Sequence, residues 1–213
     1  MRANFDPGRA SARPLVAPLA ARRVSATLLA SGLLELDDGE LVVEFDSLGP
    51  AGADAERLAE LVARLHRRGV VVHGAFTLGY DHDDEDCFAR LVAWVEACGL
   101  AGVELRLWTP TPGSEPARAL ARAGRLRHLD YARWDGAHVI VEPAAMAPET
   151  LQRGWAWALR RLSSLRSIVR RRPSGWLGWR HVFAACRRAQ FAAAESVPRE
   201  RVARPAALAS RLG

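Results

Sequence analysis

The 213-residue sequence contains no lysine, so all 30 of its basic residues are arginine. We attribute this bias to the codon usage of a GC-rich bacterial genome and not to function.

Cysteine is also scarce. The three cysteines, Cys87, Cys98 and Cys186, are odd in number and widely spaced, which excludes a disulfide framework and a zinc signature. Free thiols of this kind favour a reducing, cytoplasmic location.

Long apolar runs are absent as well. No run reaches the ~18 residues that a transmembrane helix needs. Arg22 and Arg23 precede an apolar segment at residues 24–34, as in a twin-arginine export signal. That segment is short, however, Glu35 follows it at once, and no A-x-A cleavage site is present. The sequence also has no phosphate-binding loop. We therefore expect a cytoplasmic protein without a transmembrane segment.

Charge is divided unevenly along the chain. Residues 151–213 hold 14 arginines and two acidic residues, a net charge of +12, whereas the whole chain has a net charge of +6. Residues 1–150 therefore carry −6. A basic C-terminal region on an acidic body allows an anionic partner, such as nucleic acid or an anionic surface, for residues 151–204. A solvated helix face explains the same charges.

Hydrophobic periodicity predicts an α/β fold. Three apolar, β-rich runs alternate with three amphipathic segments of helical period, and the linkers are short. The expected strands are residues 41–46, 70–78 and 103–108, and the expected helices are residues 55–68, 84–98 and 114–123. This alternation indicates parallel strands with right-handed crossovers. Three such units are too few to close an eight-stranded barrel.

The remaining segments are predicted from weaker patterns. Residues 24–34 suggest a short helix, and residues 138–141 suggest a short strand. Pro148 opens a long helix that we expect to reach residue 172, and a second helix is expected over residues 179–194.

Five segments in order carry a family resemblance. They read VEFDSL from Val43, GAFTLGYD from Gly74, WTPTPGS from Trp108, DYARWDGAHV from Asp130, and an arginine-rich helix over residues 155–172. Together they resemble the second half of a radical S-adenosylmethionine (SAM) protein of the cobalamin-binding branch. The resemblance implies a partial, half βα barrel of about three parallel βα units, followed by a C-terminal helical extension.

The resemblance implies four regions along the chain. These are a disordered or edge-covering segment at 1–34, the partial barrel at 35–125, the extension with two helices at 126–197, and a tail at 198–213.

The resemblance also implies where SAM would be contacted. Asp46 and Ser47 match the fourth-strand residues that reach the ribose and methionine, although the family has Glu where Asp46 stands. The segment that begins at Gly74 matches the family's fifth strand, whose glycines let the backbone pass close to the adenosine. The segment that begins at Trp108 matches the sixth strand, whose backbone brackets the adenine. The implied cofactor-binding residues are Asp46, Ser47, Gly74, Phe76, Gly79, Thr109 and Pro110.

The family's cluster-binding motif, CxxxCxxC, does not occur in the sequence. In the family, three thiolates at that spacing hold an iron–sulfur cluster whose open iron site binds SAM. We therefore expect no cluster on this chain, at most residual SAM binding, and no catalytic or metal-binding residue. The chain would be a non-catalytic remnant, or a subunit active only when a partner supplies the cluster-binding half. The sequence does not identify the substrate or a cobalamin requirement.

Several residues also have structural explanations. Phe76 fits a core strand residue, and Gly74 and Gly79 suit either ligand approach or strand packing. The acidic cluster at residues 81–86 favours helix capping over metal binding, with Asp83 or Asp84 as the cap of the following helix. His138 suits a buried, hydrogen-bonded histidine better than a proton donor. The tryptophans that alternate with the C-terminal arginines could either pack on the barrel or stack on nucleic-acid bases.

A half barrel would leave the strand near Val43 at an open sheet edge. Unpaired edges promote aggregation, so we expect this one to be covered by residues 1–34, by a second copy or by a partner chain. This reasoning predicts a homodimer or a hetero-complex.

Overall fold

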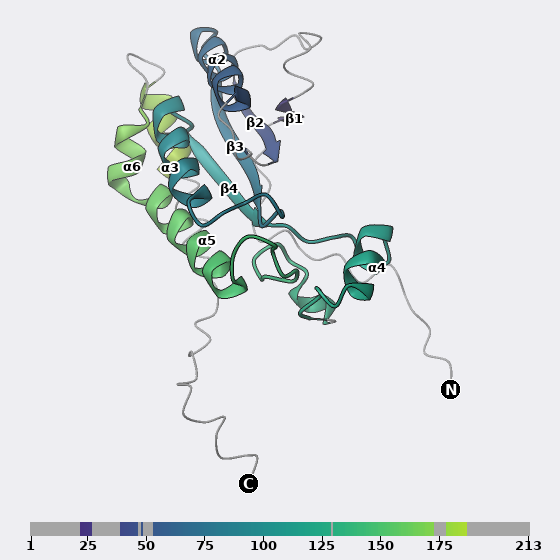
Figure 1. Ribbon diagram of the computed structural model, residues 1–213. Helices are drawn as coiled ribbons and strands as arrows, with labels where there is room; N and C mark the ends of the chain where they lie inside the picture. The colour runs from purple at the N-terminus through teal and green to yellow at the C-terminus, as the bar shows by residue number, and fades with distance from the viewer. Residues whose placement is uncertain are drawn as a thin grey trace.

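The computed structural model describes residues 22–26, 39–46, 48, 53–128, 130–172 and 178–186. Its centre is a parallel sheet with the strand order β1-β2-β3-β4 (Figure 1). The strands are β1 (Arg22–Ser25), β2 (Glu40–Asp46), β3 (Val71–Leu78) and β4 (Gly102–Leu107). The predicted α/β class with parallel strands is confirmed, and the sheet has one strand more than the three that were expected.

The additional strand is β1, which forms where a helix was expected to begin. Val24 pairs with Val43 of β2 and is 5% exposed. The helix predicted over residues 24–34 is therefore wrong for residues 24 and 25, residue 26 is helical, and residues 27–38 lie outside the described part of the chain. As a result, β2 is an interior strand, and the chain itself covers the edge near Val43.

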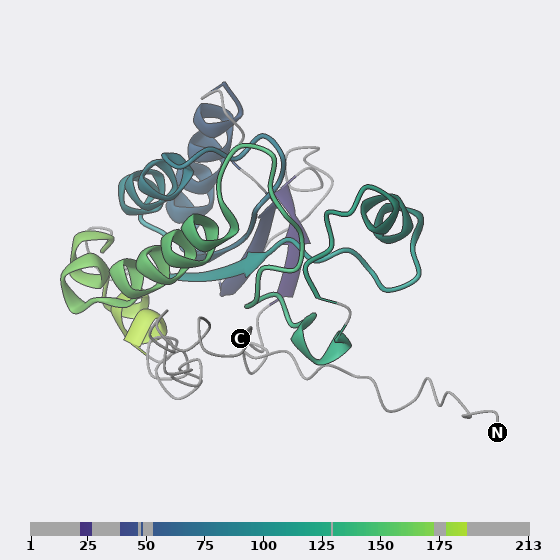
Figure 2. The ribbon, with the colours of Figure 1, turned by 60° about the horizontal axis from the view of Figure 1, so that its bottom comes forward.

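The helices α2 (Ala53–Arg67), α3 (Cys87–Cys98) and α5 (Pro148–Ser163) gather over one face of the sheet (Figure 2). The helix α4 (Glu115–Arg122) stands away from the sheet, and a 3-10 turn follows at Tyr131–Arg133. No helix among the described residues is long and apolar enough to cross a membrane.

The C-terminal elements differ from the predicted ones. The expected helix to residue 172 is two helices, because Ser164 has an extended backbone with ψ 144° and caps α6 (Leu165–Arg170) through Ser167 N–H. The expected strand at residues 138–141 is only an isolated antiparallel bridge between Leu126 and Val141. Residues 178–186 are helical, and the rest of the second predicted helix lies outside the described residues.

Aromatic rings fill the layer between the sheet and the helices. Phe45 of β2 stacks on Phe76 of β3 with 5.0 Å between ring centroids, and Trp94 of α3 meets both rings edge-on. The Trp94 indole N–H also donates to the Ala55 carbonyl of α2 at 3.0 Å. One side chain therefore fixes α3 to both the sheet and α2.

On the opposite face of the sheet, charged side chains of β1 and β4 meet. Arg23 of β1 donates two hydrogen bonds, of 2.8 and 2.7 Å, to Glu104 of β4, whose side chain is 3% exposed. Neighbouring strands lie about 4.8 Å apart, so a flat sheet would separate β1 from β4 by about 14 Å. One arginine and one glutamate bridge that distance only if the sheet curves toward this face.

At the outer edge of β4, backbone groups form hydrogen bonds with later parts of the chain. The Trp155 indole N–H of α5 donates to the Leu105 carbonyl at 3.1 Å, and the Gly136 carbonyl accepts from Leu107 N–H at 2.7 Å. Among the described residues, no strand lies beyond β1 at the other edge.

We expect Gly154→Ala to destabilise the protein by about 1–3 kcal/mol, the usual effect of overpacking a core. A methyl group at this position of α5 would lie 2.2 Å from Cε2 of Phe88 in α3. Alanine favours helix formation by about 1 kcal/mol over glycine, so a loss of stability would show that the clash dominates. Urea unfolding followed by circular dichroism measures the change. Adding Phe88→Leu to Gly154→Ala should recover part of the loss, whereas strictly additive losses would contradict this explanation.

Candidate functional site

The carboxyl ends of β2, β3 and β4 form one edge of the sheet. Leu78 pairs with Leu107, and Trp108 N–H donates to the Leu78 carbonyl at 2.7 Å. Gly79 and Thr109 therefore leave adjacent strands at the same edge, and Pro110 follows Thr109. The backbone of Asp46 pairs with Phe76 after an irregularity in β2, near the same edge. Ser47 lies outside the described residues.

Gly74 and Phe76 belong to the helix-facing core instead. A methyl group on Gly74 would lie 2.5 Å from the Phe76 ring and 2.7 Å from Leu100 Cδ1. Phe76 is itself 2% exposed. Packing alone therefore explains a glycine at position 74, and both residues lie in the core between the sheet and the helices.

A buried carboxylate shapes the loop between β3 and α3. Asp83, which is 3% exposed, accepts hydrogen bonds from Gly79 N–H at 2.8 Å and Tyr80 N–H at 3.0 Å. Gly79 needs its glycine here, since its φ is +98°. These two backbone donors are thus already used by Asp83.

The prediction that Asp83 or Asp84 caps the helix running to Cys98 is wrong, because neither is its N-cap residue. The helix α3 begins at Cys87 after Asp86, whose side chain makes no cap bond. Asp84 instead accepts from Asp86 N–H at 3.1 Å and pairs with Arg90 at 2.7 Å. The hydrogen bond from Arg90 holds the pKa of the Asp84 carboxyl below its usual value.

Aromatic side chains line this edge. Tyr80 lies with its ring centroid 5.7 Å from that of Trp108 and stacks on His82 at 5.4 Å. Beside them, Asp81 pairs with Arg125, which lowers the pKa of the Asp81 carboxyl and ties the loop to the segment that follows α4. This aromatic group was not predicted from the sequence, although Tyr80 and Trp108 lie within two residues of the ends of β3 and β4.

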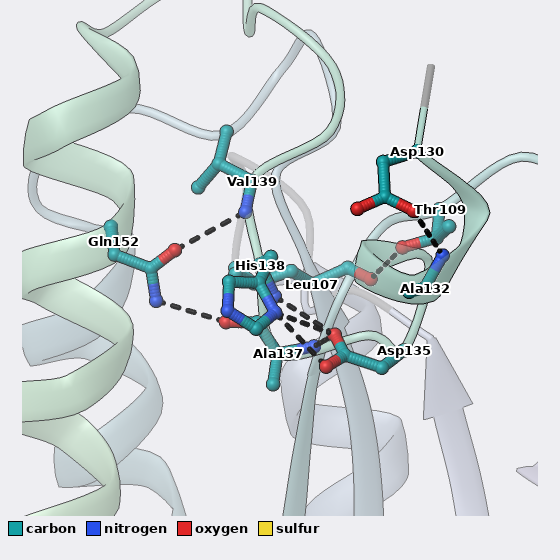
Figure 3. Close-up of polar contacts among 9 residues, drawn as sticks. All are labelled: Leu107, Thr109, Asp130, Ala132, Asp135, Ala137, His138, Val139 and Gln152. Carbon is teal, nitrogen blue, oxygen red and sulfur yellow. Dashed lines mark hydrogen bonds and ion pairs between the residues drawn. The ribbon is translucent and has the colours of Figure 1, made fainter. Parts of the chain in front are cut away.

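A tight turn after the 3-10 helix packs against the end of β4 (Figure 3). Asp135 accepts hydrogen bonds from Ala137 N–H at 2.8 Å and His138 N–H at 3.2 Å, and it binds the Nδ1 atom of His138 at 2.9 Å. The His138 side chain is 33% exposed. The predicted hydrogen bonding of His138 is therefore present, but the ring is only partly buried.

The same turn is fixed from two further directions (Figure 3). Gln152 of α5 accepts from Val139 N–H at 3.2 Å and donates to the Ala137 carbonyl at 2.9 Å. The Gly136 carbonyl bonds to Leu107 of β4, and the Thr109 hydroxyl donates to the Leu107 carbonyl at 3.1 Å. The turn is therefore held rigidly beside Thr109.

The cysteines do not fit an iron–sulfur cluster. Cys87 and Cys98 lie at opposite ends of α3, and Cys186 lies in the helix at residues 178–186. Burial raises the pKa of the Cys87 and Cys98 thiols to about 12, whereas cluster ligation requires thiolates. Within the described ranges, no group of three or more His, Cys, Asp or Glu side chains is arranged to hold a metal ion.

Part of the Arg- and Trp-rich region supports the fold. Trp155 is 5% exposed, and Arg161 and Arg170 pair with Glu96 of α3 at 3.0 and 3.4 Å. Trp157 and Trp179, by contrast, are 43% and 57% exposed. The region therefore contains both core and surface indoles.

No family model matches this chain. The chain is similar to the bacteriochlorophyllide d C-12(1)-methyltransferase of Chlorobaculum tepidum, with 25% identity over 167 residues. The match covers 78% of this chain and 35% of that enzyme, so the chain spans about a third of the length of the curated relative it matches. This similarity is consistent with the relation to radical SAM proteins that the motifs indicate.

Proposed function

We propose that this chain is a radical SAM-like protein that lacks its own cluster motif. It is either a non-catalytic remnant or a subunit that a partner completes with the cluster-binding half of the barrel. If it takes part in catalysis, the reaction is of the class named for its relative, methyl transfer, and the partner supplies the cluster.

The observation that carries this proposal is the arrangement of the strand ends. Asp46, Gly79, Thr109 and Pro110 come from three neighbouring parallel strands and share one edge of the sheet. Barrel enzymes place their chemistry at the carboxyl ends of parallel strands. The consecutive strand order and the curvature required by the Arg23–Glu104 ion pair suit a segment of such a barrel.

The two sheet edges indicate where a completing half would join. Trp155 and Gly136 already bond to the outer edge of β4. Further parallel strands would therefore extend the sheet from β1. This direction agrees with a cluster-binding half that precedes these strands in the barrel, since β1 comes first among the four strands.

Calorimetry with SAM tests the proposed site. Without a cluster to chelate the methionine part, we expect a dissociation constant near 1 mM or weaker, which corresponds to about −4 kcal/mol. Adenosine should compete, because only the adenosine half would have contacts at the strand ends. Micromolar binding of SAM would contradict a remnant and would mean that the chain holds a complete site.

Light scattering of the purified chain tests the need for a partner. We expect a dimer, or a monomer that associates with a separately produced cluster-binding half. A stable monomer with β1 open to solvent, which also fails to bind such a half, would contradict the subunit form of the proposal.

The second candidate is a basic binding module for nucleic acid or an anionic surface, acting through residues 151–204. The observation that favours it is the outer face of α6, where Leu165 and Val169 are 73% and 58% exposed beside the exposed Arg166 and Arg170. Binding to heparin that weakens steeply with salt would support this module. Failure to bind heparin at low salt would remove it.

A further inference from the structure

A hollow of about 350 Å³, partly open to solvent, lies at the outer edge of β4. It is bounded by β4, by the end of α5, by α6 and by the helix at residues 178–186. Its walls are mainly apolar, and the larger apolar contributions come from Val103, Leu105, Leu159, Leu162, Ile168 and Ala185. None of the residues expected to contact SAM lines it, so the proposed function does not account for this hollow.

The walls also contain a buried cation, the guanidinium of Arg171, which is 3% exposed. Among the described residues Arg171 forms no ion pair, and Glu96 pairs instead with Arg161 and Arg170. Burial lowers the pKa of Arg171 to about 10, so the group stays positive at neutral pH. Buried charges are normally paired with an opposite charge, whereas this one faces only the dipoles of backbone carbonyls.

The guanidinium retains a donor for a ligand. Of its five N–H groups, the one on Nε bonds to Ser167, the two on Nη1 to Leu100 and Ala101, and one on Nη2 to Leu162. The second N–H of Nη2 has no acceptor among the residues that the structure describes.

The edge of β4 supplies two more donors. Alternate residues of a strand turn their backbone groups to the same side, and the Leu105 carbonyl accepts from Trp155 at this outer edge. The N–H groups of Leu105 and of Val103, two residues earlier, therefore face outward as well. Within the described ranges, neither N–H has an acceptor in the loops or helices beyond β4.

We propose that this hollow binds a short aliphatic carboxylate, with its charged group at Arg171 and the edge of β4 and its chain among the apolar walls. A carboxylate suits the site because charge-assisted hydrogen bonds to a guanidinium are roughly twice as strong as neutral ones. A phosphate suits it less, because apolar walls do not replace the water around its further charge. The volume limits the chain to a few carbons, and the assignment does not depend on the binding of SAM.

NMR titration of the intact chain with sodium hexanoate tests the ligand class. We expect a dissociation constant of about 1 mM, with shifts of the Val103 and Leu105 amide resonances and of the Arg171 Nε–H resonance. Hexanamide has the same chain without the charge and should bind at least about tenfold more weakly. Acetate keeps the charge but lacks four methylene groups, each worth about fourfold when buried, so it should also bind at least about tenfold more weakly.

A pair of variants at Ser163, which lines the hollow at the end of α5, tests the place of binding. Ser163→Leu fills the hollow and should weaken hexanoate binding at least about tenfold, whereas Ser163→Ala leaves it open and should keep the affinity within about twofold. Both variants leave Arg171 and its carbonyl bonds in place, so they avoid the loss of stability expected when Arg171 itself is replaced.

Three results would overturn the proposal. Equal affinity for hexanoate and hexanamide would remove the role of the charge. Equal affinity of Ser163→Leu and Ser163→Ala, or shifts that leave Val103, Leu105 and Arg171 unchanged, would place the ligand elsewhere. The absence of any shift at tens of millimolar hexanoate would exclude the carboxylate site altogether.

Discussion

Replacing Arg171 with methionine is expected to lower the free energy of unfolding by about 3–5 kcal/mol. The Arg171 side chain is 3% exposed and donates to the carbonyls of Leu100, Ala101, Leu162 and Ser167, at distances from 2.6 to 3.2 Å. Methionine fills a similar volume but removes the side-chain donor from the Leu100, Ala101 and Leu162 carbonyls, whereas the Ser167 carbonyl keeps its bond from the backbone N–H of residue 171. The contacts join α5 and α6 to the start of β4, so their loss should also loosen the C-terminal helices.

Arg172→Met provides the matched control for this experiment. Arg172 is the next residue but is exposed, and surface substitutions usually change stability by less than about 0.5 kcal/mol. Chemical denaturation of both variants measures the difference. If the two variants lose stability equally, the carbonyl contacts of Arg171 do not hold the C-terminal helices in place.

Acidification is expected to destabilise the protein through His181. This residue is 1% exposed, and burial lowers its pKa from 6.5 to about 3. The positive or protonatable side chains around it, His66, His73 and Arg171, act in the same direction. Between pH 6.5 and pH 3 the unfolded chain binds a proton that the folded chain does not bind. The free energy of unfolding should therefore fall by about 1.4 kcal/mol for each pH unit below 6.5.

Urea unfolding at pH 7, 6, 5 and 4 measures this dependence. His181→Gln removes the titrating group, so the free energy of unfolding of this variant should fall by about 1.4 kcal/mol less per pH unit than that of the parent chain. An unaltered slope in His181→Gln would assign the acid sensitivity to other groups, such as the partly buried His66 that packs against His181 at 5.4 Å.

The sequence predicted the alternating core of the fold because the signals there are local. The strands β2, β3 and β4 and the helices α2 and α4 lie close to their predicted ranges, since apolar periodicity and the Ser114 cap act within a few residues. The sequence also predicted that Gly79 and Thr109 share an edge, which parallel strands require. It did not predict β1, because that strand is stabilised by pairing with β2 and by the burial of Val24.

In the candidate site, too, some features could be read from the sequence and others only from the structure. The spacing of Asp135 and His138 is visible in the sequence, but their distance, the partial exposure of the ring and the bracing by Gln152 and Leu107 are not. By itself the sequence determined the α/β order, the family resemblance and the absence of a CxxxCxxC motif. Only the tertiary structure decided that Gly74 packs in the core, that Asp83 binds backbone donors, and that Arg171 is buried. Each of these depends on contacts between distant parts of the chain or on the shape of a loop, which a local pattern of residue types does not specify.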